Sequence, residues 1–304
     1  HQKVTECSER LSELEKQESQ RMNELFSRNF DTQTTFPSKF LSSMLKSRAK
    51  ENKMALKDKN GAITEDENKI ASILKDHQIE VHKLTPNDPT VAKEFLDFIT
   101  PLPELKNDLD NPITVDEVLA AIKALNNSTP GPDSIPAFIY KKHSKLIAPL
   151  LLDEFRNAIV NERLPTSMAT AAIRYIQKKN SDCSTPKGWR PISLINLDSK
   201  VFSTIFTNRL HSIIDKLIPE QKAYIRGRNI LENIFSLDAL LSDKDNPVYA
   251  FFSDFSNAFD TVSHDWIFAV LEKFGFGPYF VSAIKTLLSN LSAHPIVGSS
   301  VKYK

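Results

Sequence analysis

Cysteine and glycine are both scarce in this sequence of 304 residues. Its two cysteines, Cys7 and Cys183, exclude a disulfide framework and a four-cysteine zinc site. Its seven glycines disfavour all-β architectures rich in tight turns, and no glycine-rich phosphate loop or His-Glu-x-x-His zinc motif is present. No apolar run approaches the roughly 18 residues that a membrane span needs, and no secretory signal is recognisable. We therefore expect a protein that is neither secreted nor partnered with a membrane.

The overall charge is nearly balanced, with 39 Lys and Arg against 38 Asp and Glu. A hydrophobic content of 40% is normal for a folded protein, and the length suffices for one large domain or two ordinary ones. The balance hides an asymmetry, because residues 171–230 carry 11 Lys and Arg against 4 Asp and Glu, whereas residues 91–170 carry 8 against 11. A local basic stretch is expected of a groove that follows phosphates, although charge alone equally allows a solvated face.

The N-terminal third predicts helices and one small hairpin. Residues 1–29 predict a charged helical arm with a sparse apolar stripe, and residues 38–50 predict a second helix. Residues 54–64 predict a hairpin, because an Asn-Gly pair supplies the positive φ that its turn needs. Thr64 is expected to cap the next helix, with Glu67 completing a capping box.

The rest of the chain mixes helices and strands, which favours an α+β fold. Thr114 and Glu117 predict a second capping box at the start of a helix. A buried strand is expected over 248–253, and Ser263 and Gly275 are expected to cap the two ends of the helix that follows. The other expected elements are helices at 138–160, with a break near Pro149, and at 198–217, and short strands at 171–176 and 191–197.

Cationic residues fall on both legs of the hairpin that these two short strands would form. Lys178 and Lys179 end the first strand, and Arg190 begins the second after a connection that contains Lys187. Two such legs can hold a polyphosphate between them, Lys as a point charge and Arg as a fork. Further along, Gly227 lies between Arg226 and Arg228. A glycine there would let a ligand approach the backbone closely, with a guanidinium group on either side. Each of these signals is weak by itself.

An acidic segment follows the expected buried strand. Asp254 ends that strand, which would place its carboxylate at the rim of a sheet. Mg²⁺ prefers carboxylate and carbonyl oxygens, so Asp254 and the Phe255 carbonyl are candidate ligands. Two-metal transfer usually needs at least two carboxylates, and Asp260, six residues further on, is better explained as a helix-entry residue. A strand-end Asp is also a common turn or cap residue, so the segment by itself leaves both interpretations open.

Six motifs then occur in a familiar order. They read Pro-Gly-Pro-Asp-Ser-Ile-Pro at 130–136, Ile-Gln-Lys-Lys at 176–179, Trp-Arg-Pro-Ile-Ser-Leu-Ile-Asn at 189–196, Asn-Arg-Leu at 208–210, Gln-Lys-Ala-Tyr-Ile-Arg-Gly-Arg at 221–228 and Asp-Phe-Ser-Asn-Ala-Phe-Asp at 254–260. Together they resemble the reverse transcriptase of non-LTR (LINE-type) retrotransposons over about residues 113–290. The hairpin at 54–64 and its neighbouring helices are similar to that family's N-terminal extension.

The resemblance implies a right-hand polymerase fold of the α+β class. Residues 1–112 would be a mainly helical N-terminal extension, residues 113–245 the fingers, and residues 246–304 the start of the palm. The implied activity is that of an RNA-directed DNA polymerase, which uses two Mg²⁺ ions and takes an RNA template, a DNA primer and deoxynucleoside triphosphates. The implied location is a ribonucleoprotein in nucleus and cytoplasm.

The resemblance also assigns roles to single residues. Asp254 would be the first of three catalytic carboxylates and would bind metal together with the Phe255 carbonyl. Ala258 would lie beneath the incoming nucleotide, and Phe259 would lie under its sugar as the gate that excludes a 2′-hydroxyl. The remaining implied roles are nucleotide binding for Lys178, Lys179 and Arg190, and nucleic-acid binding for Lys187, Arg226, Gly227 and Arg228.

The sequence departs from the family pattern at Gln177, where proline is usual, and at Asn257, where lysine is usual. The family's Gln-Gly motif, its paired Asp-Asp hairpin and its thumb are missing from residues 1–304. One carboxylate cannot hold two Mg²⁺ ions against their mutual repulsion, so we expect an incomplete metal site and no polymerase activity from these residues alone. Since both ends look cut, we expect a longer polypeptide, a complementing palm and thumb segment, or a protein assembly to supply the rest.

Two other hypotheses remain. The first is a truncated, inactive derivative of a reverse transcriptase that binds RNA or serves as a scaffold in a larger assembly. The presence of Asp254 and Phe259 argues against it, because a scaffold needs neither a metal ligand nor a sugar gate. The second is a group II intron maturase, but the motif at 189–196 and the long N-terminal extension fit the LINE type better.

Overall fold

The computed structural model describes residues 54–83, 88–102, 105, 109–242, 249–298 and 300–301. The chain divides into two compact units, residues 1–53 and residues 54–304. The helices predicted at 1–29 and 38–50 fall in the first unit, outside the described residues, and stay predictions. All described elements belong to the second unit.

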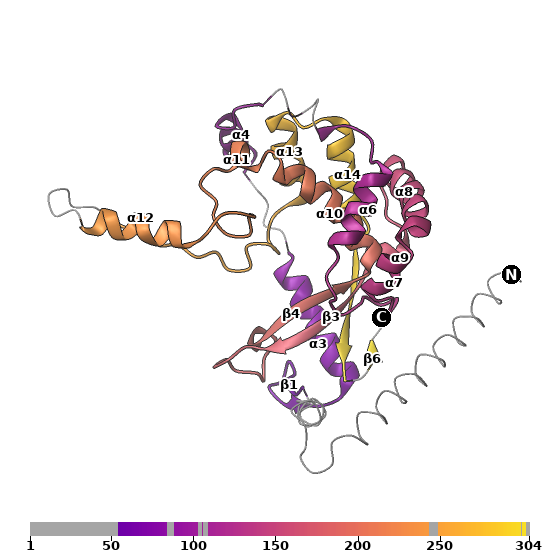
Figure 1. The fold of residues 1–304 in the computed structure, drawn as a ribbon. Helices are drawn as coiled ribbons and strands as arrows, with labels where there is room; N and C mark the ends of the chain where they lie inside the picture. The colour runs from indigo at the N-terminus through magenta and orange to yellow at the C-terminus, as the bar shows by residue number, and fades with distance from the viewer. Residues whose placement is uncertain are drawn as a thin grey trace, which may run out of the picture. The chain divides into compact units, whose positions relative to one another are not determined.

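A four-stranded mixed sheet organises this unit (Figure 1). Its strands lie in the order β4-β3-β5-β6, and their bounds are β3 Thr170–Gln177, β4 Trp189–Ile195, β5 Ser292–Val297 and β6 Ser300–Val301. β3 pairs antiparallel with β4 and parallel with β5, and β6 pairs antiparallel with β5. The strands predicted at 171–176 and 191–197 are confirmed as one antiparallel hairpin, with β4 beginning two residues earlier than expected.

The other described elements are mainly helices. The three longest are α3 (Glu67–Val81), α8 (Ser144–Val160) and α10 (Leu197–His211). The shorter ones are α4 (Pro89–Asp97), α6 (Val115–Ala124), α7 (Ala137–Lys142), α9 (Thr166–Ala169), the 3₁₀ turn η1 (Pro186–Gly188), α11 (Ile214–Leu217), α12 (Leu231–Ser242), α13 (His264–Phe274) and α14 (Pro278–Leu288).

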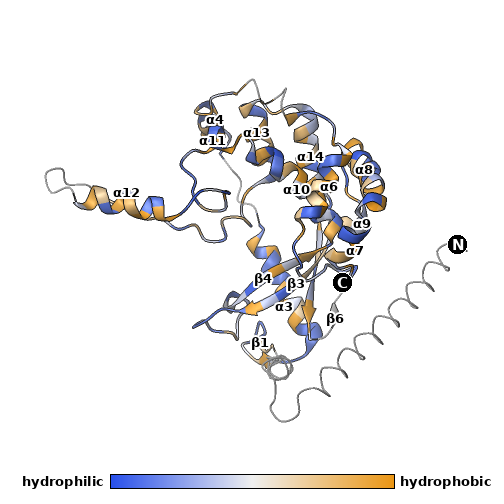
Figure 2. Ribbon diagram, viewed as in Figure 1, coloured by the Kyte–Doolittle hydropathy of each residue, from blue (hydrophilic) through white to orange (hydrophobic). Residues whose placement is uncertain are grey.

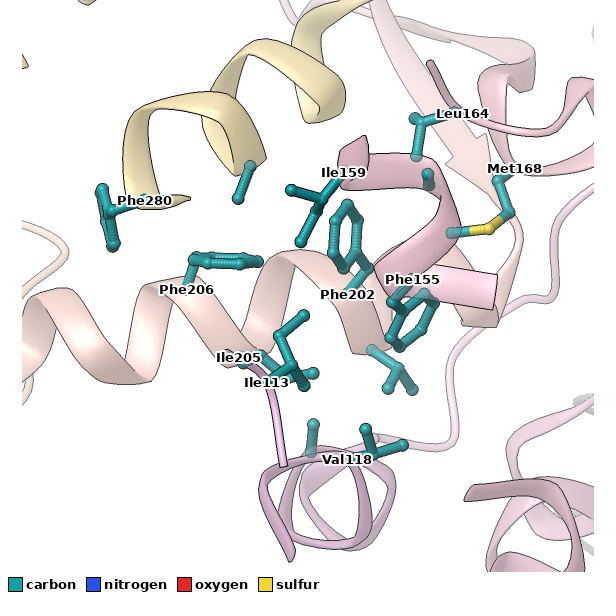
Figure 3. Packing of buried hydrophobic residues seen from close by; sticks show 14 of the residues in the cluster. Ile113, Val118, Phe155, Ile159, Leu164, Met168, Phe202, Ile205, Phe206 and Phe280 are labelled. Carbon is teal, nitrogen blue, oxygen red and sulfur yellow. The ribbon is translucent and has the colours of Figure 1, made fainter. Parts of the chain in front are cut away.

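The larger hydrophobic core lies among the helices and is built around phenylalanine rings. Phe155 on α8 stacks on Phe202 on α10, with ring centroids 4.7 Å apart, and Phe202 meets Phe206 edge-on at 5.4 Å. Phe206 in turn meets Phe280 on α14 edge-on at 5.6 Å, so one row of rings joins three helices (Figure 3). Each such pair stabilises the fold by about 0.5–1.5 kcal/mol beyond the burial of its surface.

A smaller core joins the N-terminal elements to the sheet. The strands β1 (Leu56–Lys57) and β2 (Ile63–Thr64) form the hairpin predicted at 54–64. Leu56 from β1 and Leu74 from α3 are completely buried, and they pack with Trp189 of β4 and Val297 of β5. The helix after the hairpin therefore shares its core with the sheet.

Helix capping agrees with the sequence at one site and differs at another. Thr114 and Glu117 form the predicted capping box at the start of α6. By contrast, Thr64 does not cap α3, because it lies in β2 and pairs with Leu56. The cap is Asp66, whose carboxylate accepts hydrogen bonds from the first turn of α3. The prediction of Thr64 as cap was wrong by two residues, because its strand pairing takes precedence over its local cap signal.

Two further boundaries differ from expectation. The break predicted near Pro149 falls at His143, between α7 and α8, and Pro149 lies inside α8. The predicted helix at 198–217 is interrupted after His211 and forms α10 and α11. The caps expected of the later helix are confirmed, since Ser263 accepts from the backbone of α13 and Gly275 closes that helix with a φ of 94°.

The buried strand predicted over 248–253 was wrong. Residue 248 lies outside the described part, and residues 249–254 form no regular structure. Their aromatic side chains are exposed, with Tyr249 at 101% and Phe251 at 92% of full exposure. A strand needs a neighbour to satisfy its backbone, and the described strands pair only with one another. Helix α12 is similar to this segment, because many of its residues are hydrophobic (Figure 2) and none of them is buried.

An ion pair fastens the start of α6 to α10. The Arg209 guanidinium donates to both carboxylate oxygens of Glu117, at 2.7 and 2.9 Å. It also donates to the carbonyls of Leu109 and Asn111, at 2.9 and 2.6 Å. The Arg209 side chain is only 10% exposed, so the Asn-Arg-Leu motif serves the fold here. Burial alone would raise the pKa of Glu117, but the hydrogen bonds from Arg209 and Thr114 outweigh burial and hold that pKa below its usual value.

The described residues thus confirm the α+β class, with mixed helices and sheet. Among these residues, no helix is both long and apolar enough to cross a membrane.

Candidate nucleic-acid and nucleotide site

The β3–β4 hairpin owes its shape to a tightly packed connection. The Lys178 N–H donates to the Gly188 carbonyl at 2.8 Å, which extends the ladder past the last strand residue. A Cβ on Gly188 would lie 2.1 Å from the Asp182 carbonyl oxygen, so only glycine fits there. The Trp189 indole donates to the Cys183 carbonyl at 2.9 Å, and Cys183 packs against the smaller core. The connection is therefore held on the same side of the sheet as α3.

The two faces of this hairpin differ in what covers them. In the antiparallel register Ile176 pairs with Arg190 and Arg174 pairs with Ile192, so these four side chains share one face. Lys178 follows on the same face by alternation. All but Lys178, which is partly buried, are exposed. Because this side of the hairpin is open to solvent, we call these five residues the open face.

The opposite face carries Tyr175 and Trp189 and packs against α3. Burial raises the pKa of Tyr175 to about 12, and a hydrogen bond with Gln78 opposes the rise. Lys179 is exposed in the turn that follows β3. The assignment of Lys178, Lys179 and Arg190 to nucleotide binding stays a prediction.

The tip of the hairpin lies close to α3. Burial and the positive charges of Lys187 and Lys178 lower the pKa of His77 on α3. Lys187 is exposed in η1. Burial and the two lysines near the tip therefore both disfavour the protonated form of His77.

The acidic segment is an exposed loop. Asp254, Phe255, Ala258 and Phe259 are all exposed, the two phenylalanine rings at 79% and 87%. The loop turns at Asn257, whose φ is +52° and whose carbonyl accepts from the N–H of Asp260 at 3.0 Å. Asparagine tolerates this left-handed conformation better than most residues do.

Asp260 does not lie at a helix entry, as the sequence suggested, because α13 begins four residues later. Its carboxylate instead pairs with His82, at the C-terminal end of α3, at 3.8 Å. Both side chains border a cavity of about 840 Å³ between α3 and the sheet, whose lining includes Lys75, Tyr175 and His294. The acidic loop is thus connected to the N-terminal elements through Asp260.

The Arg226-Gly227-Arg228 run forms a turn after α11. The Arg228 guanidinium donates to the carbonyls of Ile218 and Gln221, at 2.6 and 2.5 Å, and pairs with Asp215. Its side chain is 11% exposed, so it holds the turn together. Gly227 has a φ of +81° and nothing within 4 Å of an added Cβ, so glycine serves the turn conformation there and not a close approach. Arg226 is exposed.

Two motif segments that lie far apart in sequence meet in the structure. The Asn196 amide, 3% exposed, accepts from the Asp133 N–H at 3.1 Å and donates to the Ser167 carbonyl at 2.8 Å. A Cβ on Gly131 would lie 2.2 Å from the Asn196 side chain. The Pro-Gly-Pro-Asp turn therefore rests directly on the end of β4.

The donors for a metal ion are incomplete among the described residues. Asp254 offers a carboxylate and Phe255 a carbonyl, which are the oxygen ligands that Mg²⁺ prefers. Within the described residues no group of three or more His, Cys, Asp or Glu side chains could hold a metal. In this same part of the chain, no hydrogen bond or ion pair joins Asp254 to the open face. These residues supply part of a ligand set and do not by themselves make a two-ion site.

Comparison with known proteins identifies the class. Residues 176–303, which include β4, the connection before it and the acidic loop, match the family described as reverse transcriptase (RNA-dependent DNA polymerase).

The similar proteins belong to transposons. The chain is 30% identical to a transposon TX1 protein of Xenopus laevis over 67% of its own length, and 32% identical to a probable RNA-directed DNA polymerase from transposon BS of Drosophila melanogaster over 56%. It is 30% identical over 54% to a Pol polyprotein from the type-1 retrotransposable element R2 of Popillia japonica. The chain spans 16%, 19% and 22% of the lengths of these relatives. The resemblance is confirmed, and the chain carries a reverse transcriptase domain of the non-LTR retrotransposon type.

One residue of the open face was missed from the sequence. Arg174 lies within the predicted strand, and no motif includes it. The pairing of Arg174 with Ile192 and of Ile176 with Arg190 places Arg174 diagonally opposite Arg190 on the same face. The alternation of side chains along one strand could be predicted from the sequence. The register between β3 and β4, which decides which residues of the two strands lie next to each other, could not.

Proposed function

We propose that this chain is the N-terminal extension, fingers and beginning of the palm of an RNA-directed DNA polymerase. The observation that carries the proposal is the reverse transcriptase match over residues 176–303, which contains Lys178, Arg190 and the acidic loop. The proposed boundaries are residues 1–112, 113–245 and 246–304. The partners would be an RNA template, a DNA primer and deoxynucleoside triphosphates, within a nuclear and cytoplasmic ribonucleoprotein.

The hairpin would bind the triphosphate. Lys178 follows the end of β3 and Arg190 lies near the start of β4, so an ammonium group and a guanidinium fork can contact phosphate oxygens from both legs of the hairpin. Lys179 and Lys187 would add positive charge near the tip. Holding the triphosphate in one orientation raises the rate by placing its α-phosphorus in line with the attacking group.

The acidic loop would hold the metal ions and the sugar. Asp254 and the Phe255 carbonyl are the residues that would bind Mg²⁺, which when bound neutralises phosphate charge and lowers the pKa of the primer hydroxyl. The exposed Phe259 ring is free to lie under the sugar and exclude a 2′-hydroxyl, with Ala258 beside it. In the transfer the primer 3′-oxygen forms a bond to the α-phosphorus, the bond to pyrophosphate breaks, and the hydroxyl proton is released.

The nucleic-acid backbone would be contacted by exposed cations. Lys187 and Arg226 are exposed and suited to this. Arg228 and Gly227 would act less directly, by shaping the turn that presents Arg226, because the Arg228 guanidinium already has three partners.

Primer extension tests the proposal. We expect residues 1–304 alone to make no product, since further carboxylates are needed for the metal site. A polypeptide that continues through the family's paired-aspartate segment should extend a DNA primer on RNA with Mg²⁺ and lose that activity with Asp254→Asn. The matched control is Asp265→Asn, which removes an exposed carboxylate in the first turn of α13 and should retain activity.

Three results would count against the proposal. Undiminished extension by the Asp254→Asn polypeptide would remove Asp254 from the reaction. Product made by residues 1–304 alone would contradict the incomplete site. If the long polypeptide bound RNA but never extended a primer, the RNA-binding scaffold would replace the polymerase.

A further inference from the structure

The open face of the β3–β4 hairpin has an unusual composition for an exposed sheet surface. By register it carries Arg174 and Arg190 together with the apolar Ile176 and Ile192, and Lys178 follows where the ladder ends. The two isoleucines are 50% and 43% exposed. No acidic residue falls on this face at any paired position of the two strands. Positive charge and aliphatic surface therefore alternate without a neutralising partner.

The two arginines are arranged diagonally across the ladder. Arg174 pairs with Ile192 and Arg190 pairs with Ile176, so each guanidinium stands beside an isoleucine on its own strand and another opposite. Diagonal neighbours in such a ladder are about 7–8 Å apart, where like charges repel. Among the described residues, no hydrogen bond or ion pair occupies either guanidinium. An arrangement of this kind favours binding of an anion that contacts both.

The cations of the open face are spread over a distance greater than one phosphate group can span. Arg174 and Lys178 are four positions apart, a distance of about 13 Å along an extended strand. The predicted triphosphate contacts, Lys178 and Arg190, occupy the end near the tip. Arg174 lies further from the tip than these two residues, so a ligand that reaches it must continue along the strand. A polynucleotide strand meets this need, because its phosphates repeat and its bases and sugars can rest on aliphatic side chains.

We propose that Arg174 binds the phosphate backbone of a single-stranded RNA template on the open face of the hairpin. The proposal deepens the polymerase function and rests on it, since it supplies the template contact of the same site. Charge complementarity selects the ligand, and the isoleucines on either side provide contact without sequence preference. The residue acts in binding and not in the chemical step.

The test measures binding of a fluorescently labelled single-stranded RNA oligonucleotide to residues 1–304 by anisotropy, over a series of salt concentrations. Arg174→Gln should weaken binding roughly threefold to tenfold and should reduce the slope of log affinity against log salt by about 0.7, the value for one lost phosphate contact on a single strand. Arg174→Lys keeps the charge and should restore most of the slope. Because Arg174 is exposed, the circular dichroism and melting temperature should not change.

The matched control is Arg163→Gln, which removes an exposed arginine after α8, outside the hairpin. It should leave the slope unchanged. If Arg174→Gln binds as the unmodified chain does, or if Arg163→Gln loses as much, the template contact is refuted while the polymerase function stands. If the unmodified chain shows no salt-dependent binding of RNA, both proposals fail together.

Discussion

Replacing Arg209 with alanine tests how the fold supports the site. The substitution leaves the Glu117 carboxylate without its bidentate partner and removes the hydrogen bonds to the Leu109 and Asn111 carbonyls. Removing one partner of a buried ion pair typically costs about 3–5 kcal/mol. Glu117 is 31% exposed and regains some water, so the expected cost is near the lower end, about 3 kcal/mol.

The assay is thermal and urea unfolding of the purified chain. For a domain of this size about 3 kcal/mol corresponds to a fall in melting temperature of about 6–12 °C. Arg163→Ala is the control, because that arginine is exposed and its loss should change stability by no more than about 0.5 kcal/mol. A change below about 1 kcal/mol for Arg209→Ala would refute the assignment of this arginine to the fold.

Three further perturbations follow from single contacts. The pKa of Glu117 is lower in the folded chain than in the unfolded one. Its ionised form therefore adds its full contribution to the free energy of unfolding above the unfolded pKa of about 4.3, and that contribution is lost as the pH falls through the folded pKa. In urea unfolding, the loss of stability caused by Glu117→Gln should become smaller as the pH is lowered below about 4. Gly188→Ala places a Cβ 2.1 Å from a backbone carbonyl oxygen and should lower stability by about 1–3 kcal/mol, with melting temperature as the readout and an unchanged value as the contrary result. Asp66→Ala should cost about 1 kcal/mol because it removes the cap of α3, whereas Thr64→Ala should cost less, and the reverse order in urea unfolding would restore the cap predicted from the sequence.

Much of the fold could be predicted because its signals are local. The Asn-Gly turn, the capping box at Thr114, the serine and glycine caps of α13 and the strands of the β3–β4 hairpin each depend on residues a few positions apart. Strand pairing overrode one such signal, at Thr64, because the residue was already committed to β2.

Features that depend on distant partners could not be predicted. An apolar run such as 249–253 predicts burial, but burial needs a neighbour that the run does not identify, and here those aromatic residues are exposed. An arginine in a motif looks the same whether it binds a ligand or holds the fold, and only the structure shows that Arg209 and Arg228 have internal partners. Conversely, Arg174 lies on the same face as Arg190 because of the register between β3 and β4, which the sequence does not reveal.

The central claim is that this chain binds a template and primer for polymerisation. Its most direct test is equilibrium binding of an RNA–DNA template–primer duplex to residues 1–304 over a range of salt concentrations. We predict that log affinity falls linearly with log salt, with a slope near −0.9 for each phosphate contacted. We also predict that Asp254→Asn leaves the line unchanged, because the role proposed for that carboxylate is in the chemical step and not in binding. Binding that is absent, or that does not respond to salt, would contradict the account.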